Sequence, residues 1–137
     1  VAALKAEGRG PQDVLDDLAR KFGLYATSQL SVRVSDLSLI ADAMARLRAD
    51  PPTALGGRLV VRIDDLALGA DGLPPTDGLR FSLPDARVVI RPSGTEPKLK
   101  CYLQVVVPVT GEIADARATA DFDLDALRAG VAEALAL

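Results

Sequence analysis

The chain has 137 residues, 49% of them hydrophobic and 26% charged, as expected for one globular domain or one domain with a short piece of another attached. Its net charge of −3 and its aromatic content of 4% argue against nucleic acid as a partner, and no apolar run approaches the roughly 20 residues of a membrane span. With one cysteine and no histidine, an internal disulfide and a histidine-dependent catalytic triad are excluded, a zinc site is disfavoured, and a reducing cytoplasmic location is expected.

The first twenty-odd residues are predicted to be helical. Pro11 directly after Gly10 is typical of a helix start, because the N–H that proline lacks would be unpaired there anyway. Apolar residues then recur at helical spacing up to Phe22, and Gly23 predicts the end of the helix. A second short helix is expected over residues 1–7. Because the first residue is not methionine, we expect the chain to begin inside a longer protein.

A strand and a helix are predicted next. Apolar and polar residues alternate over residues 29–34, which indicates a half-buried strand, and residues 24–28 before it are expected to be a linker. Asp36 is a plausible cap for a helix whose apolar stripe runs to Leu47. Pro51 is expected to end this helix.

The second half of the chain is predicted to hold several strands and one closing helix. The strands are expected over residues 58–68, 79–83, 87–91 and 98–107, with a loop over residues 69–78. The closing helix is expected over residues 121–137, capped by Asp121 or Asp123, whereas residues 110–120 are compatible with a loop or a frayed helix. Strands in succession between helices predict the α+β class, an antiparallel sheet with flanking helices on one face.

The most informative stretch is the octapeptide Arg-Pro-Ser-Gly-Thr-Glu-Pro-Lys at residues 91–98, between two apolar strands. Arg91 offers a rigid fork of donors that matches a phosphate, and Ser93 and Thr95 each offer a hydroxyl group. Gly94 permits a backbone conformation that turns successive N–H groups inward, as in anion-binding nests. The octapeptide therefore predicts a phosphate-binding loop.

Two lysines follow the loop. Lys98 and Lys100 alternate with apolar residues, so both are expected on one face of their strand while the apolar side chains enter the core. Arg87 is expected to add to the same positive patch. Serine, glycine and threonine at residues 93–95 are also common in ordinary turns, and Glu96 opposes an anion site unless it points outward or forms a salt bridge. The complete octapeptide in its strand context favours the phosphate site.

The octapeptide resembles the phosphate-binding loop of the α-D-phosphohexomutases, the family of phosphoglucomutase, phosphomannomutase and phosphoglucosamine mutase. Residues 22–25, the strand at 29–34 and the closing helix also fall where this family has corresponding elements, so the resemblance covers nearly the whole chain. It implies that residues 1–27 are the tail of a third domain plus a hinge. Residues 28–137 would be the fourth, C-terminal domain, with a fold like that of the TATA-binding protein.

The resemblance implies an enzyme of carbohydrate metabolism, an isomerase that transfers a phosphoryl group within a phosphosugar and interconverts sugar 1-phosphate and 6-phosphate. The serine loop and the metal loop of the family are not found in this chain, so it is expected to hold no catalytic residue, no cofactor and no metal, and to be inactive alone. Mg²⁺ would be bound by another domain of the full-length enzyme. The expected partners are the phosphosugar and the remaining domains, with neither nucleic acid nor membrane.

The family's phosphate ligands fall on named positions of this chain. The implied ligands are Arg91, Ser93, Gly94 and Thr95, with Lys100 as the best match for a basic residue on the next strand and Lys98 as the second. The Lys-x-Lys ending resembles phosphoglucomutases and phosphopentomutases more than phosphoglucosamine mutases. The alternatives are a phosphopentomutase-type relative and a non-enzymatic phosphate-binding or regulatory module.

Overall fold

A computed structural model describes residues 10–68, 77–93 and 96–135. The elements are α2 (Pro11–Phe22), β1 (Leu24–Arg33), α3 (Leu37–Ala49), β2 (Ala54–Leu55), β3 (Arg58–Leu59), β4 (Arg62–Asp65), the 3-10 turn η1 (Leu66–Leu68), β5 (Leu79–Leu83), β6 (Ala86–Pro92), β7 (Lys98–Val107) and α4 (Ile113–Leu135). The helix expected over residues 1–7 and most of the loop expected over 69–78 lie outside the described residues.

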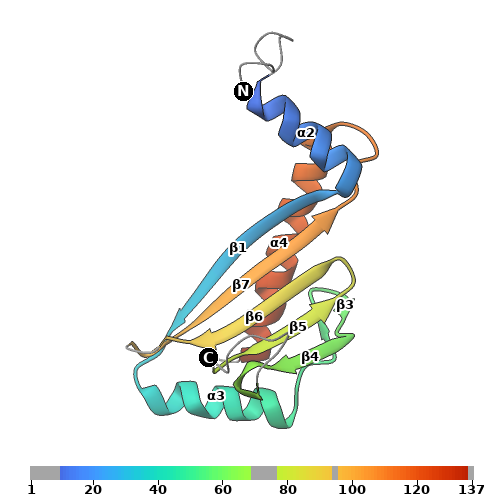
Figure 1. Ribbon diagram of the computed structural model, residues 1–137. Coiled ribbons are helices and arrows are strands. Elements are labelled where there is room, and N and C mark those ends of the chain that lie inside the picture. Colours follow the sequence, from blue (N-terminus) through green and yellow to red (C-terminus); the bar gives the residue numbers. More distant parts are fainter. Residues whose placement is uncertain (1–9, 69–76, 94–95, 136–137) are drawn as a thin grey trace.

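Five strands form one antiparallel sheet in the order β1-β7-β6-β5-β4, and β2 and β3 form a separate small hairpin. The long helix α4 lies behind this sheet, and α3 runs across its lower end (Figure 1). The predicted α+β class, with an antiparallel sheet and flanking helices, is therefore confirmed.

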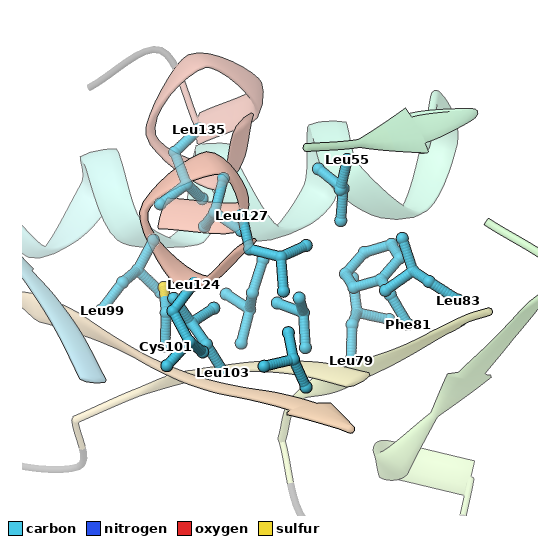
Figure 2. Packing of buried hydrophobic residues seen from close by; sticks show 14 of the residues in the cluster. Leu55, Leu79, Phe81, Leu83, Leu99, Cys101, Leu103, Leu124, Leu127 and Leu135 are labelled. Atoms are coloured by element: carbon cyan, nitrogen blue, oxygen red, sulfur yellow. The ribbon is translucent and has the colours of Figure 1, made fainter. Parts of the chain in front are cut away.

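The hydrophobic core lies between α4, α3 and one face of the sheet (Figure 2). Side chains alternate along each strand, so every second residue of β5, β6 and β7 enters this core. The buried residues of these three strands are Leu79, Phe81, Leu83, Val88, Ile90, Leu99, Cys101, Leu103, Val105 and Val107. They meet the buried stripe of α4, which is Ala116, Ala120, Leu124, Leu127, Val131 and Leu135. The opposite face of the sheet, here called the open face, carries the polar side chains.

Three predicted helix boundaries are confirmed. The helix α2 begins at Pro11, and Gly23 follows it with a φ of 94°, a left-handed conformation that suits glycine. In α3, the carboxylate of Asp36 accepts a hydrogen bond from the Ser38 N–H at 2.9 Å, which caps the helix.

The strand β1 begins five residues earlier than predicted. Residues 24–28 were expected to be a linker, but Leu24 pairs with Val107 and Ser28 with Leu103. Half-buried and exposed residues alternate along all of β1. The alternation at residues 24–28 is weak in sequence because the aromatic Tyr25 lies on the exposed face and the polar Ser28 on the half-buried face. Pairing with β7 determines the strand instead.

The prediction of a single strand over residues 58–68 is wrong. The chain changes partner within it, because the Val60 N–H donates to Thr53 and the Val61 N–H donates to Ser82. The result is β3, then β4, then η1. Leu59 and Val61 are exposed, so the apolar alternation that indicated one half-buried strand does not correspond to a buried face.

The closing helix begins at Ile113, eight residues earlier than predicted. Ile113, Ala116 and Ala120 are buried at helical spacing, so the segment that was compatible with a loop is the first part of α4. Asp121 and Asp123 therefore lie inside the helix and do not cap it. The carboxylate of Asp123 instead forms a salt bridge with Arg58 at 2.8 Å.

Candidate phosphate-binding site

The candidate loop joins β6 to β7, which are adjacent strands. The octapeptide therefore begins and ends on paired strands, and Arg91 lies directly opposite Lys100 in the register. The Ser93 N–H donates to the Lys98 carbonyl at 2.9 Å, which closes the loop at its base. Gly94 and Thr95, two of the predicted ligands, lie outside the described residues.

The two lysines point as predicted. Lys98 and Lys100 alternate with the buried Leu99 and Cys101, so both lysines lie on the open face. Burial raises the pKa of the Cys101 thiol to about 12, which makes this cysteine an unreactive core residue. The structure therefore brings Arg91, Lys98 and Lys100 to the same end of the open face as Ser93.

The open face carries a concentration of positive charge although the whole chain has a net charge of −3. Its cations, assigned from the alternation and the register, are Arg33, Arg62, Arg80, Arg87, Arg91, Lys98 and Lys100. Arg87 lies on β6, four residues before Arg91, so it faces the same side but stands further from the loop.

Acidic side chains neutralise only part of this face. Asp64 forms ion pairs with Arg62 and Arg80, each at 3.0 Å, and these hydrogen bonds, led by that of Arg80, lower the pKa of the Asp64 carboxyl. Among the described residues, neither Arg91 nor Lys100 forms an ion pair. These two cations next to the loop are therefore not paired with a described carboxylate.

Glu96 is held by a residue that the sequence reasoning did not identify. Arg33 on β1 donates a hydrogen bond to the Glu96 carboxylate at 2.5 Å, and the Lys98 ammonium lies 3.9 Å from the same oxygen. The hydrogen bond from Arg33, followed by the charge of Lys98, lowers the pKa of the Glu96 carboxyl. Of the two arrangements considered for Glu96, the structure has the salt bridge.

No local signal in the sequence identifies Arg33 as a partner of the loop, because 63 positions separate it from Glu96. The two meet because Arg33 pairs with Lys98 across β1 and β7. A backbone hydrogen bond at 2.8 Å, from the Val34 N–H to the Pro97 carbonyl, ties the same end of β1 to the loop.

Within the described residues, no group of three or more His, Cys, Asp or Glu side chains is placed to hold a metal ion. In the same part of the chain, no helix combines the length and the apolar character needed to cross a membrane.

Comparisons with known proteins identify the family of the chain. Residues 30–120 match the family profile described as "Phosphoglucomutase/phosphomannomutase, C-terminal domain". A probable phosphomannomutase of Haemophilus influenzae is 41% identical over 105 residues, covering 75% of this chain and 21% of the relative. A phosphoglucomutase of Staphylococcus epidermidis is 29% identical over 118 residues, covering 76% and 22%.

A third relative carries a different name. A probable phosphoribomutase of Schizosaccharomyces pombe is 31% identical over 109 residues, covering 66% of this chain and 19% of the relative. The chain thus spans about a fifth of the length of the curated relatives that it matches. The family profile covers more than half of the chain, so this protein belongs to the phosphoglucomutase/phosphomannomutase family and represents its C-terminal domain.

Proposed function

We propose that this domain binds the phosphate of a phosphorylated sugar, and that it does so as part of a mutase that interconverts sugar 1-phosphate and 6-phosphate. The proposed ligands are Arg91, Ser93, Gly94, Thr95, Lys98 and Lys100. Family membership supports the reaction class, and the positive end of the open face supports the position of the phosphate.

The observation that carries this proposal is the pairing of Arg91 with Lys100. Residues directly opposite each other in an antiparallel pair have Cβ atoms about 5 Å apart, and like charges at such positions destabilise a sheet. Neither cation forms an ion pair with a described carboxylate. A bound phosphate dianion would convert this repulsion into two charge-assisted interactions.

The role of the domain would be positioning. Binding the phosphate that does not react contributes free energy that orients the reacting end of the sugar. We assign the phosphoserine and Mg²⁺, which supplies charge stabilisation to phosphoryl transfer in such enzymes, to other parts of the longer protein. The chain alone is therefore expected to be inactive, and its cytoplasmic location stays a prediction.

The division predicted from the sequence separates residues 1–27, hinge included, from residues 28–137, but a boundary after residue 27 would cut through β1. Since β1 belongs to the sheet from Leu24 onward, we place the hinge at Gly23, between α2 and β1. A φ of 94° at this residue is a conformation that a side chain would disfavour.

A pentose phosphate is the second candidate substrate, because the S. pombe relative is named a probable phosphoribomutase. The phosphate ligands would be the same, so the two candidates differ only in the sugar. Ribose 1-phosphate and glucose 1-phosphate should therefore be compared side by side in the titrations below.

The phosphate site is tested by titrating the ¹⁵N-labelled chain with inorganic phosphate and glucose 1-phosphate. The largest amide shifts are expected at residues 91–100. Arg91→Ala should weaken binding of both ligands about tenfold or more, because it removes a charge-assisted, two-point contact. Arg20→Ala is the matched control, since it removes one arginine from α2, at the other end of the molecule (Figure 1).

Two outcomes would contradict the proposal. The first is that the largest amide shifts lie outside residues 91–100. The second is that Arg91→Ala binds phosphate as tightly as Arg20→Ala does. Mutase activity of the 137-residue chain alone would contradict the assignment of the catalytic groups to other domains.

A further inference from the structure

A groove of about 600 Å³ lies beside the phosphate site. Its lining residues are Thr27, Ser28, Gln29, Arg87, Val89, Tyr102, Leu103 and Gln104. They come from β1, β7 and β6, which are three neighbouring strands of the sheet. We call it the open-face groove, and its volume lies within the range of sites that bind small molecules.

The register shows how the groove is built. One row of opposed residues across the three strands is Gln29, Tyr102 and Val89, here called the tyrosine row. The next is Thr27, Gln104 and Arg87, called the amide row. The row on the other side of the tyrosine row is Ser31, Lys100 and Arg91, called the phosphate row. Successive rows on one face are about 7 Å apart, so the groove begins one row from the proposed phosphate ligands.

The chemistry of the lining differs from that of the phosphate row. Gln29 and Gln104 carry amides that both donate and accept hydrogen bonds, and Thr27 adds a hydroxyl group. Tyr102 is 37% exposed and comes from β7, the middle one of the three strands, so it adds an aromatic ring to the lining. Such a combination suits a ring with many hydroxyl groups and apolar C–H faces, because the amides bind the hydroxyls and the aromatic ring packs on the C–H groups.

Arg87 is available to a ligand. Its side chain is exposed, and it forms neither an ion pair nor a side-chain hydrogen bond with any other described residue. Arg80 on the adjacent strand β5, opposite Val89, in contrast binds Asp64. The guanidinium of Arg87 can therefore donate to ligand oxygens without first breaking an ion pair within the described chain.

We propose that the open-face groove receives the sugar ring of the phosphosugar whose phosphate lies at the phosphate row. This inference rests on the proposed function and adds the direction in which the substrate lies, along β7 from Lys100 toward Gln104. The family resemblance implies a loop outside this chain that recognises the sugar. The open-face groove would then contact the same sugar from the side of the C-terminal domain.

Three probes separate the sugar contact from the phosphate contact. Inorganic phosphate, glycerol phosphate and glucose 1-phosphate should all shift the amides of residues 91–100 in the 137-residue chain. Glucose 1-phosphate alone should also shift Thr27, Gln29 and Gln104, because only this probe has a sugar ring. Equal shifts at these three residues with all probes, or none with glucose 1-phosphate, would overturn the inference.

Two variants test the groove directly. Arg87→Gln and Gln104→Leu should each weaken glucose 1-phosphate binding about three- to tenfold, since each removes hydrogen-bond partners of the ring. Both should change the affinity for inorganic phosphate less than twofold. Gln104→Leu keeps all charges, so it shows whether any loss with Arg87→Gln reflects only the reduced positive field.

Arg62→Gln is the matched control for Arg87→Gln. Arg62 on β4 lies opposite Ser82 on β5, which in turn lies opposite Arg87 on β6. Arg62 is therefore two strands away from Arg87, and it does not line the groove. If Arg87→Gln and Arg62→Gln weaken both ligands equally, the effect is one of general charge and the groove assignment is wrong. If no probe shifts residues 91–100, the proposed function itself fails, and the inference fails with it.

Discussion

At the scale of single residues, the salt bridge between Arg33 and Glu96 resolves a contradiction in the candidate loop. A carboxylate among anion ligands would repel phosphate, but Arg33 both neutralises Glu96 and holds it at the end of β1. Lys98 stands 3.9 Å from the same carboxylate oxygen. In the proposed phosphate site, Arg33 would therefore act as a positioning residue that shares the Glu96 carboxylate with Lys98 and leaves Lys100 without an ion pair, available to the ligand.

The first prediction concerns the variant Arg33→Gln. Without its guanidinium, the pKa of Glu96 should rise toward the ordinary value of 4.5, although Lys98 still lowers it. Phosphate should bind several-fold more weakly at neutral pH, because the released carboxylate attracts Lys98 and repels the dianion. Carboxyl-detected NMR measures the pKa, and amide shifts of residues 91–100 measure the affinity.

The double variant Arg33→Gln/Glu96→Gln provides the control. It removes both charges, so phosphate affinity should return to near the wild-type value. If the double variant binds as weakly as Arg33→Gln, the loss does not come from the released carboxylate.

The contribution of the Glu96 ion pairs to stability depends on pH with a definite sign. The pKa of Glu96 is lowered in the folded protein, so its ion pairs contribute above pH 4.5 and are lost as the pH falls below that value.

At the scale of elements, the β2–β3 hairpin is fastened to α4 through two glycines. A Cβ atom built on Gly130 of α4 would lie 2.6 Å from the Gly56 backbone nitrogen. A Cβ atom on Gly56 would lie 2.9 Å from the Leu127 nitrogen, and the φ of Gly56 is 57°. The hairpin and the helix therefore approach more closely than side chains would permit.

The second prediction is that Gly130→Ala destabilises the fold. In an exposed helix interior, glycine to alanine stabilises by about 1 kcal/mol. Here the backbone of Gly56 must move, so we expect a loss of about 1–3 kcal/mol in the free energy of unfolding, measured by urea denaturation. Gly111→Ala is the control, because nothing lies within 4 Å of its Cβ position. A Gly130→Ala variant more stable than the wild type would contradict the close contact.

At the scale of the whole molecule, the core is continuous from the sheet to α3 and α4, but α2 takes almost no part in it. Ala19 is the one buried residue of α2 in the structure, whereas Leu15, Leu18 and Phe22 are 57%, 47% and 60% exposed. Figure 1 shows α2 projecting beyond the end of the sheet. This separation agrees with the proposal that α2 belongs to a preceding domain.

The third prediction is that α2 unfolds independently of the sheet. Its amides should exchange with solvent far faster than those of β6 and β7, because few buried contacts hold it. Deleting residues 1–22 should therefore change the melting temperature by only a few degrees. Leu127→Ala, in the middle of the core, should instead lower the free energy of unfolding by about 2–5 kcal/mol. Equal protection of α2 and the sheet would contradict the division.

Local sequence patterns predicted much of the fold. The helical spacing before Gly23, the cap at Asp36 and the alternation over residues 98–107 each depend on neighbours within a few positions, and each is confirmed. The octapeptide likewise indicated the family from contiguous residues, and the family profile confirms it. Such features are determined locally, because the backbone and its near neighbours suffice to favour one conformation.

Only the tertiary structure decided the features that depend on distant partners. β1 begins at Leu24 because β7 pairs with it, and residues 58–68 divide because Val60 and Val61 bond different segments. Arg33 meets Glu96, and Gln29, Tyr102 and Arg87 share one groove, through the strand register. Register depends on the simultaneous packing of many side chains far apart in the chain, and no local pattern contains that information.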